Sequence, residues 1–213
     1  DRLFDVIEQD IVPRTRAGVA AGNKVFGAAI LRKDDLSVVV AETNNELENP
    51  LWHGEMHALK RFYEMPKADR PDTRDCVFLS THEPCTLCLS AITWAGFDNF
   101  FDFFTHEDSR DSFAIPHDLR ILKEVFTLDP GGYRRDNAYW RARSVAEVIA
   151  GADPARQSAL RARAQRIADR AAALLFWFAL VAGIITFAVW LLLGFPDQAV
   201  IRTVTVLVID CPN

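Results

Sequence analysis

The chain has 213 residues and a formal net charge of −5, with 24 Lys and Arg against 29 Asp and Glu. This length allows one domain of ordinary size with a substantial core and leaves a further segment. The negative charge lies in residues 1–150, which hold 18 Lys and Arg against 25 Asp and Glu, whereas 151–213 hold 6 against 4. Nucleic acid is therefore not the expected partner, because its sequence-independent affinity comes mainly from basic side chains.

The first part of the chain alternates helical and strand patterns. The first helical segment is amphipathic and is expected to be interrupted near Pro13. Helices are predicted at 3–21, 53–64, 85–94 and 116–126, and strands at 25–32, 37–43, 75–81 and 99–105. Helices that alternate with strands after an opening hairpin predict an α/β fold in which part of the sheet is parallel.

Two histidines and a glutamate lie close together in the stretch WHGEMH, residues 52–57. Zinc proteases use H-E-x-x-H, with the glutamate directly after the first histidine. Here Glu55 follows His53 by two residues, which turns it about 200° away on a helix, while His53 and His57 share a face. This order does not fit a zinc protease. Glu55 can instead carry protons beside one histidine ligand, provided that further ligands lie elsewhere.

Further ligands are found in HEPCTLC, residues 82–88. A Cys-x-x-Cys pair at the start of a helix places both sulfurs on one face of the first turn, and Pro84 is suited to the helix entry. Free backbone N–H groups and the helix dipole favour the thiolates there. Together with His53, Cys85 and Cys88 form a ligand set that fits Zn²⁺ with a fourth position left to water. The set predicts a catalytic metal.

H-x-E followed by P-C-x-x-C resembles the signature of zinc-dependent nucleobase and nucleoside deaminases. The resemblance implies that His53, Cys85 and Cys88 hold zinc. It also implies that Glu55 is the general acid/base that moves protons from water to the base and to the departing ammonia. For residues 1–150 it implies the three-layer α/β/α cytidine-deaminase-like fold with a central mixed sheet, a base or nucleoside as substrate, and a homodimer.

The resemblance extends to the segments that precede the zinc motif. KVFGAAI, residues 24–30, is similar to the family's first core strand, whose Phe lines the pocket, here Phe26. In ETNNELENPLW, residues 42–52, the family has an asparagine that holds the base or sugar; Asn45 is favoured and Asn44 is its rival. The form HGE is more similar to cytosine deaminases than to the HAE of guanine and tRNA-adenosine deaminases. Cytosine or cytidine is thus the favoured substrate, and guanine or tRNA adenosine is the alternative.

Four more side chains are weighed as substrate contacts or as ordinary structure. Trp52, beside the expected ligand, and Phe26 are candidates to stack on a base, and core packing is the alternative for both. The polar run HEDSRD, residues 106–111, follows the last expected strand, where the family has a specificity loop. Asp108 and Ser109 are therefore candidate contacts, against the alternative of a merely solvated loop.

Other uses of the cysteines and histidines are open at this point. A structural zinc site would be closed by His82 or His57 as fourth ligand, and Cys-x-x-Cys alone also occurs in redox pairs. A zinc-stabilised interaction module tethered to a membrane is the alternative outside enzymes. The remaining cysteines, Cys76 and Cys211, give no disulfide pattern, so a reducing, cytoplasmic compartment is expected.

The C-terminal part is a different kind of sequence. Residues 171–195 are 25 residues without a charge, long enough to cross a bilayer, and they predict a transmembrane helix and a membrane anchor. They follow an Arg-rich linker or helix at 151–170, which the positive-inside rule keeps in the cytoplasm. A buried helix of a soluble protein is the alternative. We expect residues after 150 to contribute nothing to deamination.

The same part resembles a second family. From about Ser158 onward, RAQRIADRAA and VIRTVTVLVIDCPN are similar to the membrane region of heavy-metal-transporting P-type ATPases. In that family the second stretch leads into a Cys-Pro metal-binding motif, which Asp210 and Asn213 interrupt here. The segment 196–213 is therefore expected to be a truncated tail, and no pump is inferred.

Overall fold

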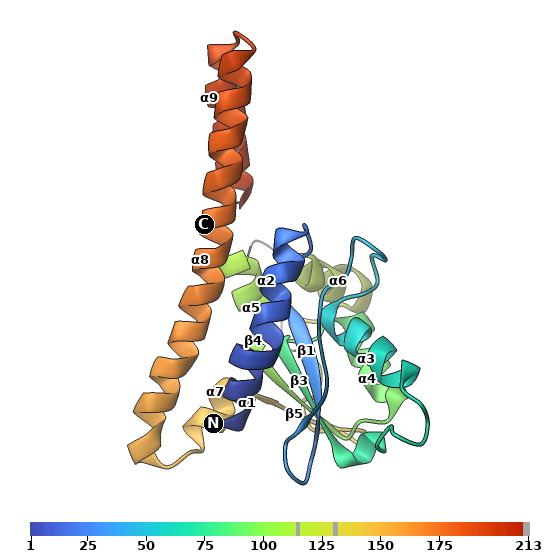
Figure 1. The fold of residues 1–213 in the computed structure, drawn as a ribbon. Helices are drawn as coiled ribbons and strands as arrows, with labels where there is room; N and C mark the ends of the chain where they lie inside the picture. The colour runs from blue at the N-terminus through green and yellow to red at the C-terminus, as the bar shows by residue number, and fades with distance from the viewer. Residues whose placement is uncertain (114–115, 130–131, 211–213) are drawn as a thin grey trace.

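A computed structural model of the chain describes residues 1–113, 116–129 and 132–210 (Figure 1). Its strands are β1 (Gly27–Arg32), β2 (Val38–Thr43), β3 (Cys76–His82), β4 (Asn99–Phe104) and β5 (Arg141–Ser144). Its α-helices are α1 (Arg2–Val6), α2 (Val12–Ala20), α3 (Gly54–Glu64), α4 (Thr86–Ala95), α5 (His106–Phe113), α6 (His117–Phe126), α7 (Val145–Ala150), α8 (Pro154–Leu192) and α9 (Pro196–Asp210). A π-helical turn, η1 (Ile7–Ile11), joins α1 to α2, and a 3₁₀ turn, η2 (Thr73–Asp75), precedes β3.

The strands form one mixed sheet in the order β2-β1-β3-β4-β5. β1 is antiparallel to β2 and β3, whereas β3, β4 and β5 are parallel to one another. The ends of β2 and β3 therefore lie at the same edge of the sheet as the start of β1. The helices α3 and α4, which carry the two metal motifs, follow β2 and β3 and start at this edge, where α/β folds bind their ligands.

The side chains of the sheet pack against helices on both faces, as alternation along a strand requires. From β1, Ala28 and Ile30 join a core on the face covered by α3 and α4, and Ala29 and Leu31 join a core on the other face, beside α1 and η1. Helices thus cover both faces of the mixed sheet (Figure 1). This is the α/β/α layering expected for residues 1–150.

The N-terminal helix is not interrupted at Pro13. Instead, the helix widens into the π turn Ile7–Ile11, and Pro13 lies at the start of α2. A proline in a helix lacks its N–H and crowds the carbonyl one turn before it. A π turn is a known local change of helix geometry, and here it lies just where the proline would otherwise break the helix.

Three elements of the deaminase-like part differ from the sequence-based prediction. The polar run 106–111, expected as a loop, is the first turn and a half of α5. The strand β5 and the helix α7 were not predicted. The strand has only four residues, RARS, of which Ala142 alone is buried, so its extended form depends on pairing with β4 and leaves little pattern in the sequence.

The C-terminal part is a helical hairpin. The linker or helix expected at 151–170 and the helix expected at 171–195 are one continuous helix, α8, from Pro154 to Leu192. Asp153 caps it by accepting a hydrogen bond from the N–H of Ala155. Of the segment 196–213, expected as a truncated tail, Pro196–Asp210 form α9, which folds back beside α8 (Figure 1), and 211–213, with Cys211 and Asn213, lie outside the described residues. Gly194, with φ of 82°, makes the turn between the two helices.

The first half of α8 packs against the N-terminal helices. Ile167 is buried in the same core as Phe4 and Ile7, and Arg163 forms ion pairs with Asp5 and Glu8 at 2.7 and 2.8 Å. The second half of α8 and all of α9 extend beyond the sheet (Figure 1). Within the described parts of the chain, no helix is both long enough and apolar enough to cross a membrane.

Candidate zinc centre and active site

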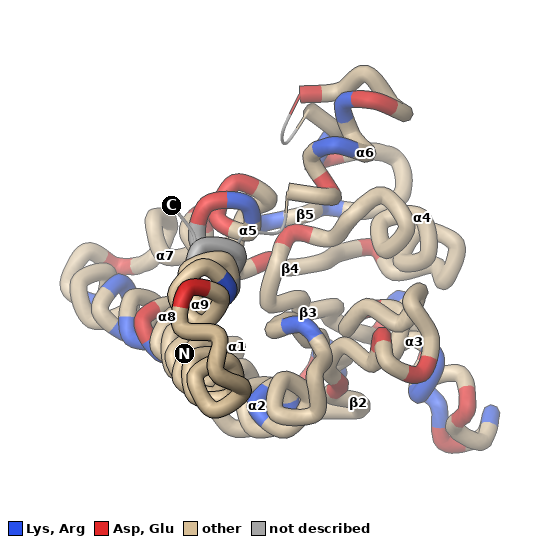
Figure 2. Tube along the Cα trace, turned by 90° about the horizontal axis from the view of Figure 1, so that it is seen from above, with Lys and Arg blue, Asp and Glu red and all other residues tan. Residues whose placement is uncertain are grey.

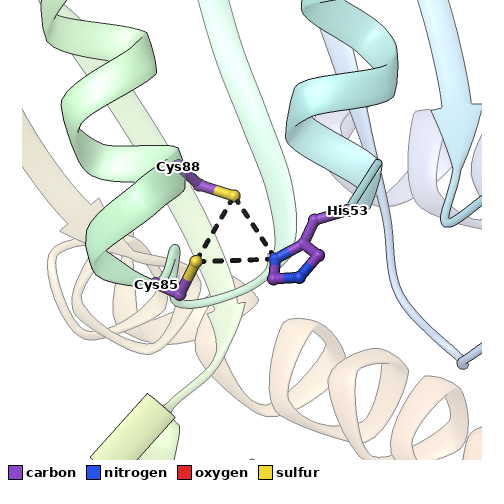
Figure 3. Close-up of side chains that lie close together, drawn as sticks. All are labelled: His53, Cys85 and Cys88. Atoms are coloured by element: carbon purple, nitrogen blue, oxygen red, sulfur yellow. Dashed lines mark hydrogen bonds between the residues drawn. The ribbon is translucent and has the colours of Figure 1, made fainter. Parts of the chain in front are cut away.

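Two helix starts bring the predicted metal ligands together. His53 is the residue that precedes α3, Cys85 is the residue that precedes α4, and Cys88 lies in the first turn of α4. The Nδ1 atom of His53 is 3.5 Å from the Cys85 sulfur and 3.7 Å from the Cys88 sulfur, and the two sulfurs are 3.6 Å apart (Figure 3). Among the described residues, these are the ones whose ligand atoms gather closely enough to hold a metal ion.

The triangle has the dimensions of a zinc site. Tetrahedral zinc, with Zn–S of about 2.3 Å and Zn–N of about 2.0 Å, places two sulfurs about 3.8 Å apart and a sulfur and a nitrogen about 3.6 Å apart. The observed separations of 3.5 to 3.7 Å agree with these values. The residues therefore fit Zn²⁺, with a fourth position left for a water molecule.

The protonation of the three ligands suits metal binding. Hydrogen bonding from the Cys88 thiol, together with the contact to His53, lowers the pKa of the Cys85 thiol to about 4, so that this sulfur is a thiolate at neutral pH. The contact with Cys85 raises the pKa of His53 to about 9. The contact with Cys85 also raises the pKa of the Cys88 thiol, which keeps its proton. An arriving metal therefore displaces a proton from His53 and one from Cys88, because metal ligands bind in their deprotonated forms.

The other nitrogen of His53 faces a carboxylate. Its Nε2 lies 3.7 Å from Glu46 Oε1, and Glu46 is paired with Lys24 at 3.1 Å. A carboxylate behind a metal-bound imidazole orients the ring and makes it a stronger ligand.

Gly54 sets the position of α3 against the sheet. Its N–H donates to Oδ1 of Asn44 at 2.6 Å, and a Cβ atom at this position would lie 2.6 Å from the Cα of Gly27. The backbones of α3 and β1 therefore touch, and only glycine allows this approach. The glycine of HGE is explained by this packing, so it gives no information about whether the substrate is cytosine.

Glu55 is fully buried beside the ligands but is not one of them. Its Oε1 accepts a hydrogen bond from Ser80 Oγ at 2.7 Å, and its Oε2 lies 3.4 Å from the Cys88 sulfur. Burial raises the pKa of Glu55. A carboxyl with a raised pKa next to a metal site is suited to take up a proton and release it again in one reaction.

A cavity of about 40 Å³ adjoins the triangle and has room for water. Its lining residues come from five segments of the chain and include one of the metal ligands. They are Lys24, Phe26, Asn44, Glu46, His53, His82, His117 and Asp118.

The structure brings some of the predicted substrate contacts to this cavity and places others away from it. Phe26 and Asn44 line it. Asn45, which the sequence favoured over Asn44, donates its side-chain N–H to Glu48 on the surface. Trp52 is not among the lining residues; its ring stacks on His57 at 5.9 Å between centroids.

Asp108 and Ser109 are also outside the cavity lining. Both side chains form hydrogen bonds with the backbone of Thr105. Asp108 Oδ2 accepts from the Thr105 N–H at 2.8 Å, and the Ser109 hydroxyl donates to the Thr105 carbonyl at 3.0 Å. Their part in substrate binding stays a prediction of the sequence.

The two histidines considered as a fourth ligand make other contacts. The Nδ1–H of His57 donates to the carbonyl of Thr43 at 2.9 Å. His82 stacks on Phe26 with ring centroids 4.2 Å apart, and its Nδ1 lies 3.4 Å from Glu55. Neither imidazole joins the triangle of ligand atoms.

Sequence reasoning missed part of the cavity. His117 and Asp118, at the start of α6, lie 29 and 30 residues after Cys88 in the chain. Asp118 is buried, and burial raises its pKa. Its sequence signal was an acidic residue in the first turn of a helix, which is common in helices of every function.

Sequence comparison with known proteins agrees with the geometry. The family described as cytidine and deoxycytidylate deaminase zinc-binding region matches residues 8–102. Guanine deaminase of Bacillus subtilis is 32% identical over 112 residues, which are 51% of this chain and 67% of that protein. The X-ray structure of guanine deaminase from Bacillus subtilis superimposes with a TM-score of 0.43 at 27% identity, over 51% of this chain and 68% of that one.

A second similarity concerns a transporter. A probable copper-transporting P-type ATPase B of Staphylococcus haemolyticus is 44% identical over 54 residues, which are 25% of this chain and 8% of the ATPase. So small a share of that protein carries no conclusion about transport.

The arrangement supports hydrolysis of an amino group. Zinc held by this ligand set supplies Lewis-acid activation of a water molecule. Glu55 lies where it can hold the proton of that water and pass it on, and Phe26 and His82 form an aromatic wall of the cavity. The protein is a zinc-dependent hydrolytic deaminase, and the chain belongs to the cytidine and deoxycytidylate deaminase zinc-binding family.

Proposed function

We propose that the chain deaminates a free purine base and that guanine is its preferred substrate. The observation that carries the proposal is the buried carboxyl of Asp118, which lines the cavity together with His53 and Phe26. The relative from Bacillus subtilis named guanine deaminase supports the same choice.

The case for guanine depends on the two atoms that flank the reacting carbon. In each amino base, the general acid/base, here Glu55, protonates the ring nitrogen on one side of that carbon. On the other side guanine has a ring N–H, whereas adenine and cytosine have a carbon atom. A carboxylate accepts a hydrogen bond from the N–H and none from the carbon. The proposal puts Asp118 on this second side, where it selects guanine.

Asn44 is the better candidate for the asparagine that holds the base. Its Oδ1 is engaged by the N–H of Gly54, so the amide offers its own N–H groups to an acceptor atom of the substrate. It also lines the cavity, whereas Asn45 is bonded to Glu48. Phe26, stacked on His82, supplies a flat apolar surface for the ring of the base.

The distribution of charge fits a small substrate. Acidic and basic residues are intermixed around the sheet (Figure 2), and the whole chain is acidic. This supports a free base over tRNA adenosine, because binding of a polynucleotide draws on clustered basic side chains.

Replacing the carboxylate of Asp118 by an amide tests the proposal. In Asp118→Asn the acceptor is weakened, and we expect kcat/KM for guanine to fall by about 10- to 100-fold, the effect of leaving one polar group unpaired. Zinc content should be unchanged. Asp111→Asn, the same substitution on an exposed residue of α5, should keep the wild-type rate. A wild-type rate in Asp118→Asn, or a higher kcat/KM of the wild type for cytosine or adenine, contradicts the proposal.

We also propose three further properties: a homodimer, a cytoplasmic location, and membrane association through residues 171–195. The exposed apolar side chains of the hairpin, among them Phe176, Trp177 and Ile184, support association with an apolar partner or surface. Sedimentation with and without lipid vesicles measures oligomeric state and membrane association in the same sample.

A further inference from the structure

A buried polar cluster surrounds Glu83 in the segment that joins β3 to α4, which we call the Glu83-Pro84 segment. None of its side chains lines the active-site cavity or belongs to the metal triangle. Its members, which we call the Glu83 cluster, are Glu83, Asp102, His106, Tyr133 and Arg135. Glu83, Asp102 and His106 are each at most 3% exposed.

The carboxylate of Glu83 is surrounded by donors. The Tyr133 hydroxyl donates to its Oε1 at 2.5 Å, and Arg135 Nη1 donates to the same oxygen at 3.1 Å. The backbone N–H of His106 donates to Oε2 at 3.0 Å. The second Nη atom of Arg135 pairs with Asp102 at 2.5 Å. One guanidinium therefore joins two buried carboxylates, Glu83 just after β3 and Asp102 within the neighbouring strand β4.

The cluster is joined to the residue before the metal ligand. The backbone N–H of Glu83 donates to the carbonyl of Phe104 at 2.6 Å, and the ring Nε2 of His106 donates to the carbonyl of Pro84 at 3.3 Å. The carbonyl of Pro84 belongs to the peptide unit that continues into Cys85. The path from Arg135 to the Cys85 backbone thus consists of Glu83, His106 and Pro84.

We propose that Arg135 and Tyr133 are positioning residues for zinc. By holding Glu83 they fix the position of the Glu83-Pro84 segment. The position of this segment sets how far the Cys85 sulfur lies from His53. A buried carboxylate that has lost its donors raises the free energy of the folded state. Without Arg135 or Tyr133, Glu83 therefore turns toward water, and the Glu83-Pro84 segment moves with it. Ligand distances in zinc sites lie within about 0.2 Å of their usual values, so a displaced Cys85 sulfur weakens the site. The inference rests on the zinc site and is independent of the base that is deaminated.

Zinc affinity measured without substrate tests this role. We compare Arg135→Met and Tyr133→Phe with wild type by competition against a chromophoric chelator, and use Arg134→Met as the matched control because Arg134 is the exposed neighbour. We expect zinc affinity to fall by about 10- to 100-fold in the first two variants, as for other partners behind metal ligands. Arg134→Met should bind like wild type, and Arg135→Lys should recover part of the loss.

A second readout separates positioning from a general loss of stability. Co²⁺ in place of zinc gives a visible absorption band whose intensity reports tetrahedral binding by two sulfurs, and we expect it to weaken in folded Tyr133→Phe, in which only a hydroxyl is missing. Unchanged zinc affinity and an unchanged cobalt spectrum in Tyr133→Phe, or an equal loss of affinity in Arg134→Met, overturn the proposal. If Arg135→Met fails to fold, Tyr133→Phe and Arg135→Lys decide the question. A failure of the guanine assignment leaves all these measurements unaffected.

Discussion

Glu55 and Cys88 lie side by side, with 3.4 Å between the Glu55 Oε2 atom and the Cys88 sulfur, but they have different roles in the proposed mechanism. We propose that the sulfur holds the metal and that the carboxyl moves protons. We expect Glu55→Ala to keep its zinc and to lose at least about 10²-fold in turnover, as when a general acid/base is removed. Metal content is measured by emission spectroscopy and turnover by ammonia release.

Glu64→Ala is the matched control, because Glu64 lies at the other end of α3 in exposed ion pairs with Lys60 and Arg61. Both its zinc content and its rate should equal those of wild type. A Glu55→Ala protein that turns over at the wild-type rate contradicts the role given to Glu55, and one that loses its zinc shows that the carboxyl is needed as a ligand.

His82 makes stability depend on pH. Burial lowers its pKa to about 4, from an ordinary value of about 6.5. Between these two pH values the unfolded chain binds a proton that the folded chain does not, so the free energy of unfolding falls as the pH falls. We expect His82→Gln to remove a slope that amounts to about 3 kcal/mol over this range.

Urea unfolding of wild type and His82→Gln at a series of pH values checks this. The difference between the two proteins is the relevant quantity, because contributions from the zinc ligands occur in both. Parallel stability curves between pH 6.5 and pH 4 would show that the imidazole titrates as an ordinary surface group.

At the scale of single residues, the sequence was sufficient where spacing determines geometry. Cys85 and Cys88 are one helical turn apart, so their sulfurs had to lie together. The choice between Asn44 and Asn45 could not be made from the sequence. Adjacent residues at the end of a strand point to opposite sides, and the register of β2 decides which side faces the cavity.

Among the elements, α3 and β1 have the closest approach, between Gly54 and Gly27. In Gly54→Ala the new Cβ would lie 2.6 Å from the Gly27 Cα, so α3 must move away from the sheet and carry His53 with it. We expect a loss of about 1–3 kcal/mol in unfolding free energy, the usual cost of overpacking. Zinc affinity should fall as well. Urea unfolding and chelator competition measure the two effects.

Gly151→Ala is the control, since a Cβ atom there would have its nearest neighbour at 3.6 Å. This variant should be as stable as wild type. Equal stability and equal zinc affinity of Gly54→Ala and wild type would mean that the two backbones are not in contact, and the packing explanation of HGE would then fail.

At this scale the sequence predicted the elements with their own hydrophobic pattern. The buried strand β3 and the helices α3 and α4 are examples. It did not predict β5, whose exposed arginines alternate with small or polar residues. Such a strand is determined by its neighbour β4, which tertiary structure supplies and local sequence does not.

At the scale of the whole molecule, the chain joins a deaminase fold to a long helical hairpin. Truncated chains can test which part of α8 the deaminase fold needs for its stability. A chain that ends at Ala172 keeps Ile167 and Arg163, which pack on the N-terminal helices, whereas a chain that ends at Gly151 loses both. We expect the shorter chain to be less stable by about 2–5 kcal/mol, the range for losing a large buried side chain. The longer chain should match the whole protein in rate per zinc ion.

Thermal unfolding and ammonia release of the two truncated chains provide the comparison. If both melt at the same temperature, the first half of α8 adds nothing to the fold. If the chain ending at Ala172 is inactive although it binds zinc, then the hairpin takes part in deamination.

The sequence contained a sign of this packing. Leu160, Ala164 and Ile167 recur at helical spacing among the arginines of the segment 151–170, and all three contact the core. The change from acidic to Arg-rich composition was interpreted as a boundary, with a linker or helix at 151–170. The partner surface on α1 and η1 was not visible from the segment itself.

Ammonia release from guanine by the zinc-loaded chain tests the central claim most directly. The chain should convert guanine to xanthine with one ammonia per base, at a higher kcat/KM than for cytosine, cytidine, adenine or adenosine, and a zinc chelator should abolish the reaction. Release of no ammonia from any of these compounds by a folded chain with one zinc ion would contradict the assignment as a deaminase. A preference for cytosine would contradict the assignment of guanine alone.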